Sequence, residues 1–199
     1  TAPMGMEMQA TFWAYAQTGA LGNMFFRRYI LINKTDVLGD PRTFDSMYVS
    51  MWSDVDLGNS SDDFAGSDTT LSLMYCYNGI ANDPTYNPLP PPAVGFDFFQ
   101  GPLVDGVAGE DKNKNGVDDA DDFGIFRGAN VGPGKINLPM TAAYYFTRGD
   151  ATVTDPVLGS PDEGAARFYR FMQGRIGLTG APFINPATGL PTPFVLSGD

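Results

Sequence analysis

The sequence predicts a mainly β fold, an antiparallel β-sandwich of jelly-roll type with long loops and one short helix near residues 161–173. Runs rich in aromatic and β-branched residues recur along the chain, and clusters of Gly and Pro separate them. Helical periodicity is well marked only once, late in the chain. No repeat of about 20–50 residues and no alternation of strands with helices is visible, which disfavours solenoids and parallel α/β folds.

Six runs are predicted as strands. The first, 6–17, alternates along its length, so one face of the strand is mostly apolar. The second, 24–33, follows after a short turn-like link, GALGN. Prolines exclude a central strand from 78–92. The other four expected strands are 46–53, 69–78, 93–103 and 136–148.

The expected helix has both a start signal and a stop signal. Ser160 is a candidate N-cap, Pro161 takes the first helical position, and Glu163 completes a capping box. Gly174 can end the helix. Side chains at helical spacing between these signals are Phe168, Phe171, Met172 and Arg175.

Composition narrows the classes of function. Of the 199 residues, 43% are hydrophobic, enough for a sizeable core, and we expect a single domain over 1–199. The formal net charge of -11 disfavours a nucleic-acid partner, which requires a basic surface. No run of about 18 apolar residues is present, so no membrane span is expected. The absence of histidine removes the commonest general base and imidazole zinc ligand.

The most specific motif is DKNKNGVDDADD, residues 111–122, within a Gly- and Asp-rich excursion at about 104–134. It follows the D-x-[DN]-x-[DN]-G calcium-loop pattern. Gly116 permits the sharp turn, and a hard cation needs six to eight oxygen ligands. We therefore expect a structural Ca²⁺ site on a β scaffold. Its predicted ligands are Asp111, Asn113, Asn115, the Val117 carbonyl, Asp119 and Asp122.

A second acidic cluster gives an additional candidate metal site. No Lys or Arg lies between its first and last carboxylates, so a bound cation would remove their mutual repulsion. The spacing matches no known loop pattern, and the alternative is a set of turn-forming Asp residues that accept hydrogen bonds from backbone amides. The members of the cluster are Asp54, Asp56, Asp62, Asp63 and Asp68.

Two further functions remain open from the residues alone. A glycoside hydrolase needs two carboxylates across a sugar-sized cleft, and only three Glu residues are present; we expect no enzymatic activity. A carbohydrate-binding module needs exposed aromatic rings beside a groove, although such rings more often pack in the core. The candidate rings are Trp13, Tyr15, Trp52, Tyr75, Tyr77 and Tyr86.

The run from MYVSMWSDVDLGNSSDDFAGSD to LMYCYNG, followed by PPPAVGFDFFQGPL, resembles a region of large modular secreted proteins. These proteins come from bacteria of the Bacteroidetes, Chlorobi and Ignavibacteria group and often end in a type IX secretion sorting domain. The runs MTAAYYFTRGD and PFINPATGLPTPFVLSGD look like the same family. The resemblance implies an exported protein, of which this chain is an excerpt.

Together these observations predict an extracellular or cell-surface calcium-binding structural module of an adhesion or filament-forming protein. Its expected partners are calcium and copies of itself or other surface proteins, with polysaccharide as the alternative ligand. The chain starts without a signal-peptide pattern and ends on an apolar stretch, which also indicates an excerpt of a longer protein.

Overall fold

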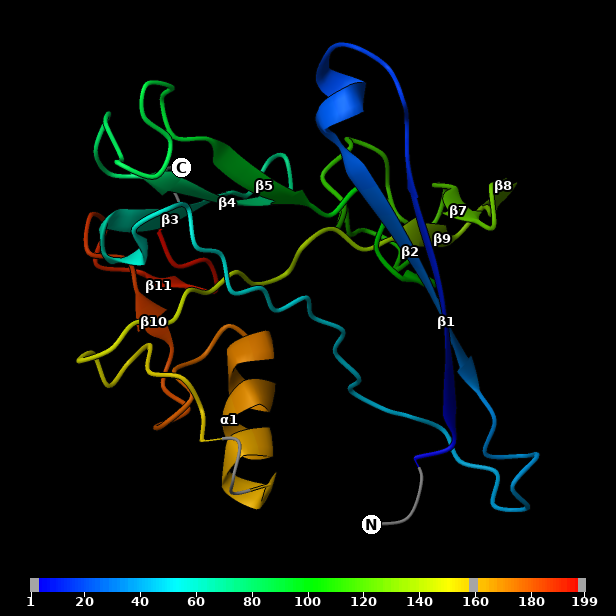
Figure 1. The fold of residues 1–199 in the computed structure, drawn as a ribbon. Coiled ribbons are helices and arrows are strands. Elements are labelled where there is room, and N and C mark those ends of the chain that lie inside the picture. Colours follow the sequence, from blue (N-terminus) through cyan, green and yellow to red (C-terminus); the bar gives the residue numbers. More distant parts are fainter. Residues whose placement is uncertain (1–3, 158–160, 197–199) are drawn as a thin grey trace. The chain divides into compact units, whose positions relative to one another are not determined.

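A computed structural model describes residues 4–157 and 161–196. The chain divides into two compact units, Thr1–Met47 and Tyr48–Asp199. The described residues form mainly strands and one α-helix, and every pairing between strands is antiparallel. This confirms the mainly β class with one short helix (Figure 1). The strands form separate sheets of two or three strands, and no closure into a sandwich is seen in the described ranges.

The first unit is a long two-stranded ribbon. Strand β1 (Met6–Ala14) pairs with β2 (Phe25–Asn33) across nine residue pairs, and the 3-10 turn η1 (Ala20–Asn23) lies between them. The two strands expected over 6–17 and 24–33 are therefore present as a hairpin, and the first of them ends at Ala14. Trp13 stacks on Phe26 with ring centroids 5.3 Å apart, which is a typical cross-strand aromatic contact.

A three-stranded sheet is the largest in the second unit. It has the order β3 (Asp63–Asp68), β4 (Leu73–Asn78), β5 (Ala93–Asp97), and the turn η2 (Ser60–Asp62) precedes it. Strands β4 and β5 confirm parts of the expected strands 69–78 and 93–103. Strand β3 was not expected because its sequence, DFAGSD, is rich in residues with low β-propensity. Pairing with β4 overrides that local preference.

The prediction of a strand over 46–53 is wrong. These residues are irregular, and Ser46 has a positive φ of 53°. A strand is held by hydrogen bonds to a neighbour, and no strand pairing involves this segment. Its residue pattern alone therefore did not determine its structure.

Four short strands frame the loop at 106–123. Strand β6 (Leu103–Asp105) pairs with β9 (Lys135–Asn137), and β7 (Gly124–Phe126) pairs with β8 (Ala129–Val131). The strand expected over 136–148 is thus present only at its start, as β9. It ends early because Pro139, two residues after β9, has no N–H to donate to a neighbouring strand. Ile136 of β9 is fully buried and anchors this part of the unit.

The helix α1 (Pro161–Met172) confirms the predicted helix, and Gly174 follows it with a φ of +74° as expected for a C-terminal glycine. The predicted cap Ser160 lies outside the described residues. Phe171 packs with Val153 and with Phe183 of β10 (Phe183–Ile184), which pairs with β11 (Pro191–Thr192). Together they form the main hydrophobic core of the unit.

The segment 193–196 joins two parts of the second unit. The Ser67 N–H donates to the Leu196 carbonyl at 3.2 Å, and its buried hydroxyl lies 3.3 Å from the Val195 carbonyl. On its other side the segment exchanges backbone hydrogen bonds with Ala143. This segment therefore covers β3, which has β4 on only one side.

Over 4–157 and 161–196, no helix combines the length and the apolar character that a membrane span requires.

Candidate metal centre

The predicted calcium loop connects β6 to β7, and both of its ends are held on the short strands that frame it. The Gly106 N–H donates to the Gly134 carbonyl at 3.0 Å, and the Gly134 N–H donates to the Asp122 carbonyl at 2.9 Å. A Cβ atom at Gly106 would collide with the backbone of Asp119, so glycine is required for this close approach. The ends of the loop therefore lie close together on a β scaffold.

The first half of the loop folds around the Asp111 carboxylate. Its Oδ1 accepts the Asn115 N–H at 3.1 Å, and its Oδ2 accepts the Gly116 N–H at 2.9 Å. Gly116 has a φ of +85° and Lys114 a φ of +57°, which makes the turn sharp. The Val117 N–H donates to Asn115 Oδ1 at 2.8 Å. The turn predicted at Gly116 is present.

The amide side chains of the loop converge on the Asp122 carboxylate. Asn113 Nδ2 and Asn115 Nδ2 donate to Asp122 Oδ2 at 2.7 and 2.8 Å. These hydrogen bonds, that of Asn113 first, hold the pKa of Asp122 below its ordinary value together with the Phe123 N–H. Rotation of either amide by half a turn exchanges its NH₂ group for an oxygen. The structure thus brings together side chains at positions 3, 5 and 12 of the pattern.

Asp119 is the most buried side chain of the loop, with an exposed fraction of 0%. Its Oδ1 accepts the Lys112 N–H at 3.0 Å, which directs the carboxylate into the loop. Its Oδ2 is buried and has no hydrogen-bond partner. A buried carboxylate oxygen without a partner is costly, and a bound cation is one of the few groups that remove this cost. The residues present therefore fit a hard cation.

The ammonium group of Lys112 is directed to Glu110, outside the motif at 111–122. Lys112 Nζ lies 3.0 Å from Glu110 Oε2 in an exposed ion pair. Among the described residues, no group of three or more His, Cys, Asp or Glu side chains gathers where it could hold a metal. In the loop, amide oxygens and a backbone carbonyl would have to complete the ligand set, as calcium permits.

The second acidic cluster is not brought to one point. Asp54 and Asp56 are exposed on an irregular segment. Asp63 and Asp68 lie at opposite ends of β3. They are five residues apart, and a strand rises about 3.3 Å per residue, so their carboxylates are too far apart to bind one ion. Asp68 Oδ1 accepts hydrogen bonds from the backbone and hydroxyl of Thr70 and from Leu71, as a turn-forming Asp does.

Within that cluster, only Asp62 and Asp63 keep buried carboxylate oxygens without partners. These are both oxygens of Asp62 and Oδ1 of Asp63, whose Oδ2 accepts the Leu57 N–H at 2.8 Å. Two adjacent carboxylates are far fewer oxygens than calcium requires. The cluster therefore has a much weaker basis as a metal site than the loop at 111–122.

The residue that sequence reasoning missed in this region is Asp83, which is fully buried. It accepts the Asn59 N–H at 2.8 Å and the Thr85 N–H at 2.6 Å, and Asn78 Nδ2 lies 3.3 Å away. These bonds, that of Asn59 first, lower the pKa of Asp83. Gly58 has a positive φ, and a Cβ there would collide with the carboxylate. The spacing Asp-x-Thr at 83–85 is a turn signal that suggests such a role.

We expect Asp83 to contribute to the loss of stability in acid. Its pKa is lower in the folded state, so its stabilisation is present above the unfolded pKa near 4 and is lost as pH falls through the folded pKa. Asp83→Asn should therefore reduce the difference in unfolding free energy between pH 7 and about pH 3, measured by urea denaturation.

Asp97→Asn is the control with the opposite sign. Desolvation by neighbouring groups raises the pKa of Asp97, so its loss should enlarge the difference in unfolding free energy between the two pH values. An Asp83→Asn variant with the same acid sensitivity as the parent chain would contradict the role assigned to Asp83.

The aromatic side chains proposed for carbohydrate are divided between the two units. Tyr75 and Tyr77 lie together on β4, with ring centroids 6.1 Å apart. In the first unit, Trp13 and Tyr15 both contact Phe26. Trp52 lies exposed in the irregular segment that follows Tyr48. Only the pair on β4 belongs to a sheet of more than two strands.

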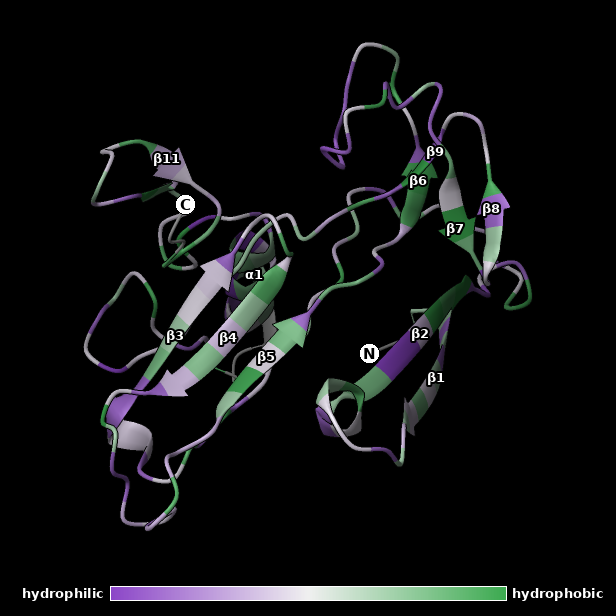
Figure 2. Ribbon diagram, turned by 90° about the horizontal axis from the view of Figure 1, so that it is seen from above, coloured by the Kyte–Doolittle hydropathy of each residue, from purple (hydrophilic) through white to green (hydrophobic). Residues whose placement is uncertain are grey.

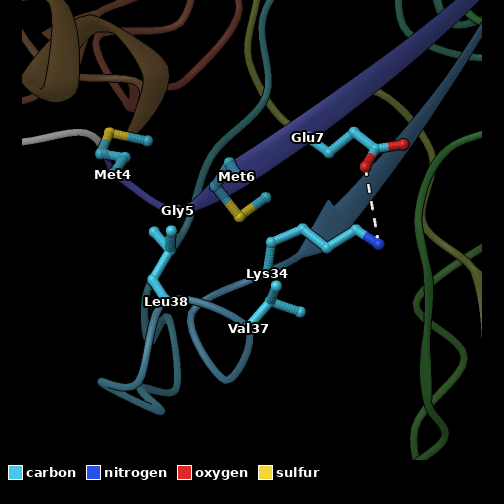
Figure 3. A pocket seen from close by; sticks show the side chains of 7 residues that line it. All are labelled: Met4, Gly5, Met6, Glu7, Lys34, Val37 and Leu38. Atoms are coloured by element: carbon cyan, nitrogen blue, oxygen red, sulfur yellow. Dashed lines mark ion pairs between the residues drawn. The ribbon is translucent and has the colours of Figure 1, made fainter.

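A shallow pocket of about 460 Å³ lies in the first unit, where the start of β1 meets the turn after β2. Figure 3 shows Glu7 and Lys34 at its edge, with Glu7 Oε2 3.6 Å from Lys34 Nζ. Glu7 is the one carboxylate that lines it, whereas glycoside hydrolysis requires two. Its other lining residues are Met4, Gly5, Met6, Val37 and Leu38.

Comparisons with family models, with curated proteins and with solved structures find no match to this chain.

Proposed function

We propose that this chain is an extracellular, calcium-stabilised structural module of a cell-surface, adhesion or filament-forming protein. The observation that carries the proposal is Asp119, whose buried Oδ2 has no partner in a loop with calcium-ligand spacing. A structural module needs a rigid loop, and a cation at this position would convert a buried electrostatic cost into a stabilising contact.

The ligands of the proposed site are oxygen atoms only. Asp111, Asp119 and Asp122 would supply carboxylates, Asn113 and Asn115 would supply amide oxygens after rotation of their amides, and the Val117 carbonyl would complete the set. Hard oxygen ligands favour calcium or magnesium over zinc, and the chain has no histidine to bind a softer metal. The size and flexibility of the loop favour calcium, because magnesium requires a near-ideal octahedron.

An extracellular location fits the proposed metal chemistry. Extracellular modules bind calcium with dissociation constants of about 10⁻⁴–10⁻³ M, and an aspartate at position 12 gives a shorter ligand than the usual glutamate. The resemblance to large exported modular proteins supports the same location. The proposal keeps an antiparallel, jelly-roll-like β-sandwich as the architecture of the mature protein, of which the small sheets are parts.

The proposed mechanism is stabilisation by mass action. An ion that binds the ordered loop and not its disordered form shifts the equilibrium toward the ordered loop. Because Gly106 and Gly134 hold the loop beside the ends of β6 and β9, ordering of the loop should also stabilise those strands. Calcium would act here as a structural component and not as a catalyst.

Calorimetric calcium titration and limited proteolysis test the proposal. Asp111→Ala removes one ligand and two hydrogen bonds, so the loop should be cleaved at least about tenfold faster in calcium than in the parent chain. Asp121→Ala is the matched control, since it removes an exposed carboxylate of the same loop. Its calcium affinity should remain close to that of the parent.

Two results would overturn the proposal. One is the absence of saturable heat in the titration of the parent chain with calcium. The other is equal proteolysis of the 104–134 region in calcium and in chelator, because calcium would then leave the loop unchanged.

A further inference from the structure

One face of the β3-β4-β5 sheet has an unusual arrangement of side chains. Residues directly opposite in an antiparallel sheet point to the same face, and every second residue along a strand does so too. The register therefore places Phe64, Tyr77 and Ala93 in one row, and Gly66, Tyr75 and Gly95 in the next. Figure 2 shows the three strands side by side. The opposite face carries Ser67, whose side chain is buried.

Three aromatic rings on this face form a connected group, which we call the ring platform: Phe64, Tyr75 and Tyr77. The ring of Phe64 lies 5.9 Å from that of Tyr77 with an interplanar angle of 30°. The ring of Tyr75 lies 6.1 Å from Tyr77 at 34°. Phe64 is 54% exposed and Tyr77 is 44% exposed. Each ring is thus turned only slightly from its neighbour, and the group is open to a ligand.

Two glycines allow the rings to lie against the backbone. A Cβ atom at Gly66 would collide with the ring of Tyr75, and a Cβ atom at Gly79 would collide with the ring of Phe64. Any other residue at either position would force a ring upward from the sheet. The two glycines therefore let the rings of Tyr75 and Phe64 lie close to the backbone of the sheet.

Polar groups surround the ring platform. The next row of the same face holds Asp68, Leu73 and Asp97, so that one carboxylate lies on each side of Leu73. Asp68 uses its Oδ1 in the turn with Thr70, and Asp97 is exposed. The tyrosine hydroxyls and these carboxylates are hydrogen-bond partners for hydroxyl groups.

We propose that the ring platform binds a neutral β-1,4-linked polysaccharide. Pyranose rings have flat faces of C–H groups, which pack on the negatively charged faces of aromatic rings, and equatorial hydroxyls, which bond to the surrounding polar groups. A β-1,4-linked chain is an extended ribbon, and it can run along the ring platform, in which neighbouring ring planes differ by 30° and 34°. The net charge of -11 disfavours an anionic polymer.

The site would serve attachment and not cleavage, because the face is an open surface. The calcium loop lies between β6 and β7, away from these strands in sequence and in strand pairing. Glycan binding should therefore persist in chelator if the sheet remains folded, and a failure of the calcium proposal would not affect this one.

The test is affinity electrophoresis through gels that contain hydroxyethyl cellulose, glycol chitin or glucomannan, with and without calcium. The parent chain should be retarded by at least one of these polymers. Tyr77→Ala should raise the dissociation constant obtained from the retardation about tenfold or more, which corresponds to about 1.4 kcal/mol of binding free energy. Tyr77→Leu keeps apolar bulk and removes the flat ring, so it should also lose binding. Circular dichroism checks that each variant is folded.

Trp52→Ala is the control, since it removes an exposed aromatic ring outside the ring platform. Its retardation should equal that of the parent. The proposal is overturned if none of the three polymers retards the parent chain. It is also overturned if Tyr77→Leu is retarded like the parent, or if its only effect is to dissociate an oligomer in sedimentation, because the face would then be an interface between copies.

Discussion

Replacement of Asp119 by asparagine is expected to make the loop at least as stable as that of the parent chain without calcium, and less stable than it with calcium. The substitution keeps the shape of the side chain and the acceptor for the Lys112 N–H, and it removes the buried negative charge whose Oδ2 has no partner. Without calcium, the variant should be at least as stable as the parent, because a buried unpaired charge is more costly than a buried amide. With calcium, it should bind about a hundredfold more weakly.

Thermal melts of both chains, in calcium and in chelator, measure these two differences in stability. The parent chain should be the more stable one in calcium, and the Asp119→Asn variant should be equal or better in chelator. Asp121→Asn is the control, because it changes the same charge at an exposed position of the loop. If Asp119→Asn and the parent gain equally from calcium, then Asp119 is not a ligand and the proposed centre is wrong.

Phe171→Ala is expected to cause the largest loss of stability in the second unit. Phe171 is 5% exposed, and its ring lies 4.9 Å from that of Tyr144 and 5.1 Å from that of Phe146. Truncation of a buried aromatic side chain costs about 3–5 kcal/mol, since it leaves a cavity as well as losing transfer free energy. The small number of buried apolar residues in this core leaves little to fill the cavity.

Urea denaturation followed by tyrosine fluorescence measures the expected loss. Leu190→Ala removes an exposed aliphatic side chain from the same unit and should change the unfolding free energy by less than about 0.5 kcal/mol. A Phe171→Ala variant as stable as Leu190→Ala would show that the helix α1 is not anchored through this ring.

Elements with a strong local pattern were predicted from the sequence. The alternation before the GALGN turn and the stop signal at Gly174 determine local geometry directly, so β1, β2 and α1 are confirmed. Strand β3 was missed because its pairing with β4, and not its composition, makes it a strand. The run 46–53 was misread for the opposite reason, since a favourable composition found no neighbouring strand.

The candidate site shows the same limit of local reasoning. The calcium-loop spacing placed Gly116 at a turn and brought Asn113 and Asn115 to Asp122, because these contacts lie within one short loop. The role of Asp83 depends on Asn59, which is 24 residues away, and no local pattern encodes that contact. The ring platform likewise depends on the register between β3 and β4, which places Gly66 beside Tyr75.

The contacts between Ser67 and residues 195–196 have a consequence for the order of folding. The hydrogen bond from Ser67 to Val195 spans 128 positions of the chain. Contacts between such distant residues slow folding, because the entropy of closing a long loop is lost before the contact forms. During synthesis the edge of β3 stays uncovered until the last of these residues has left the ribosome.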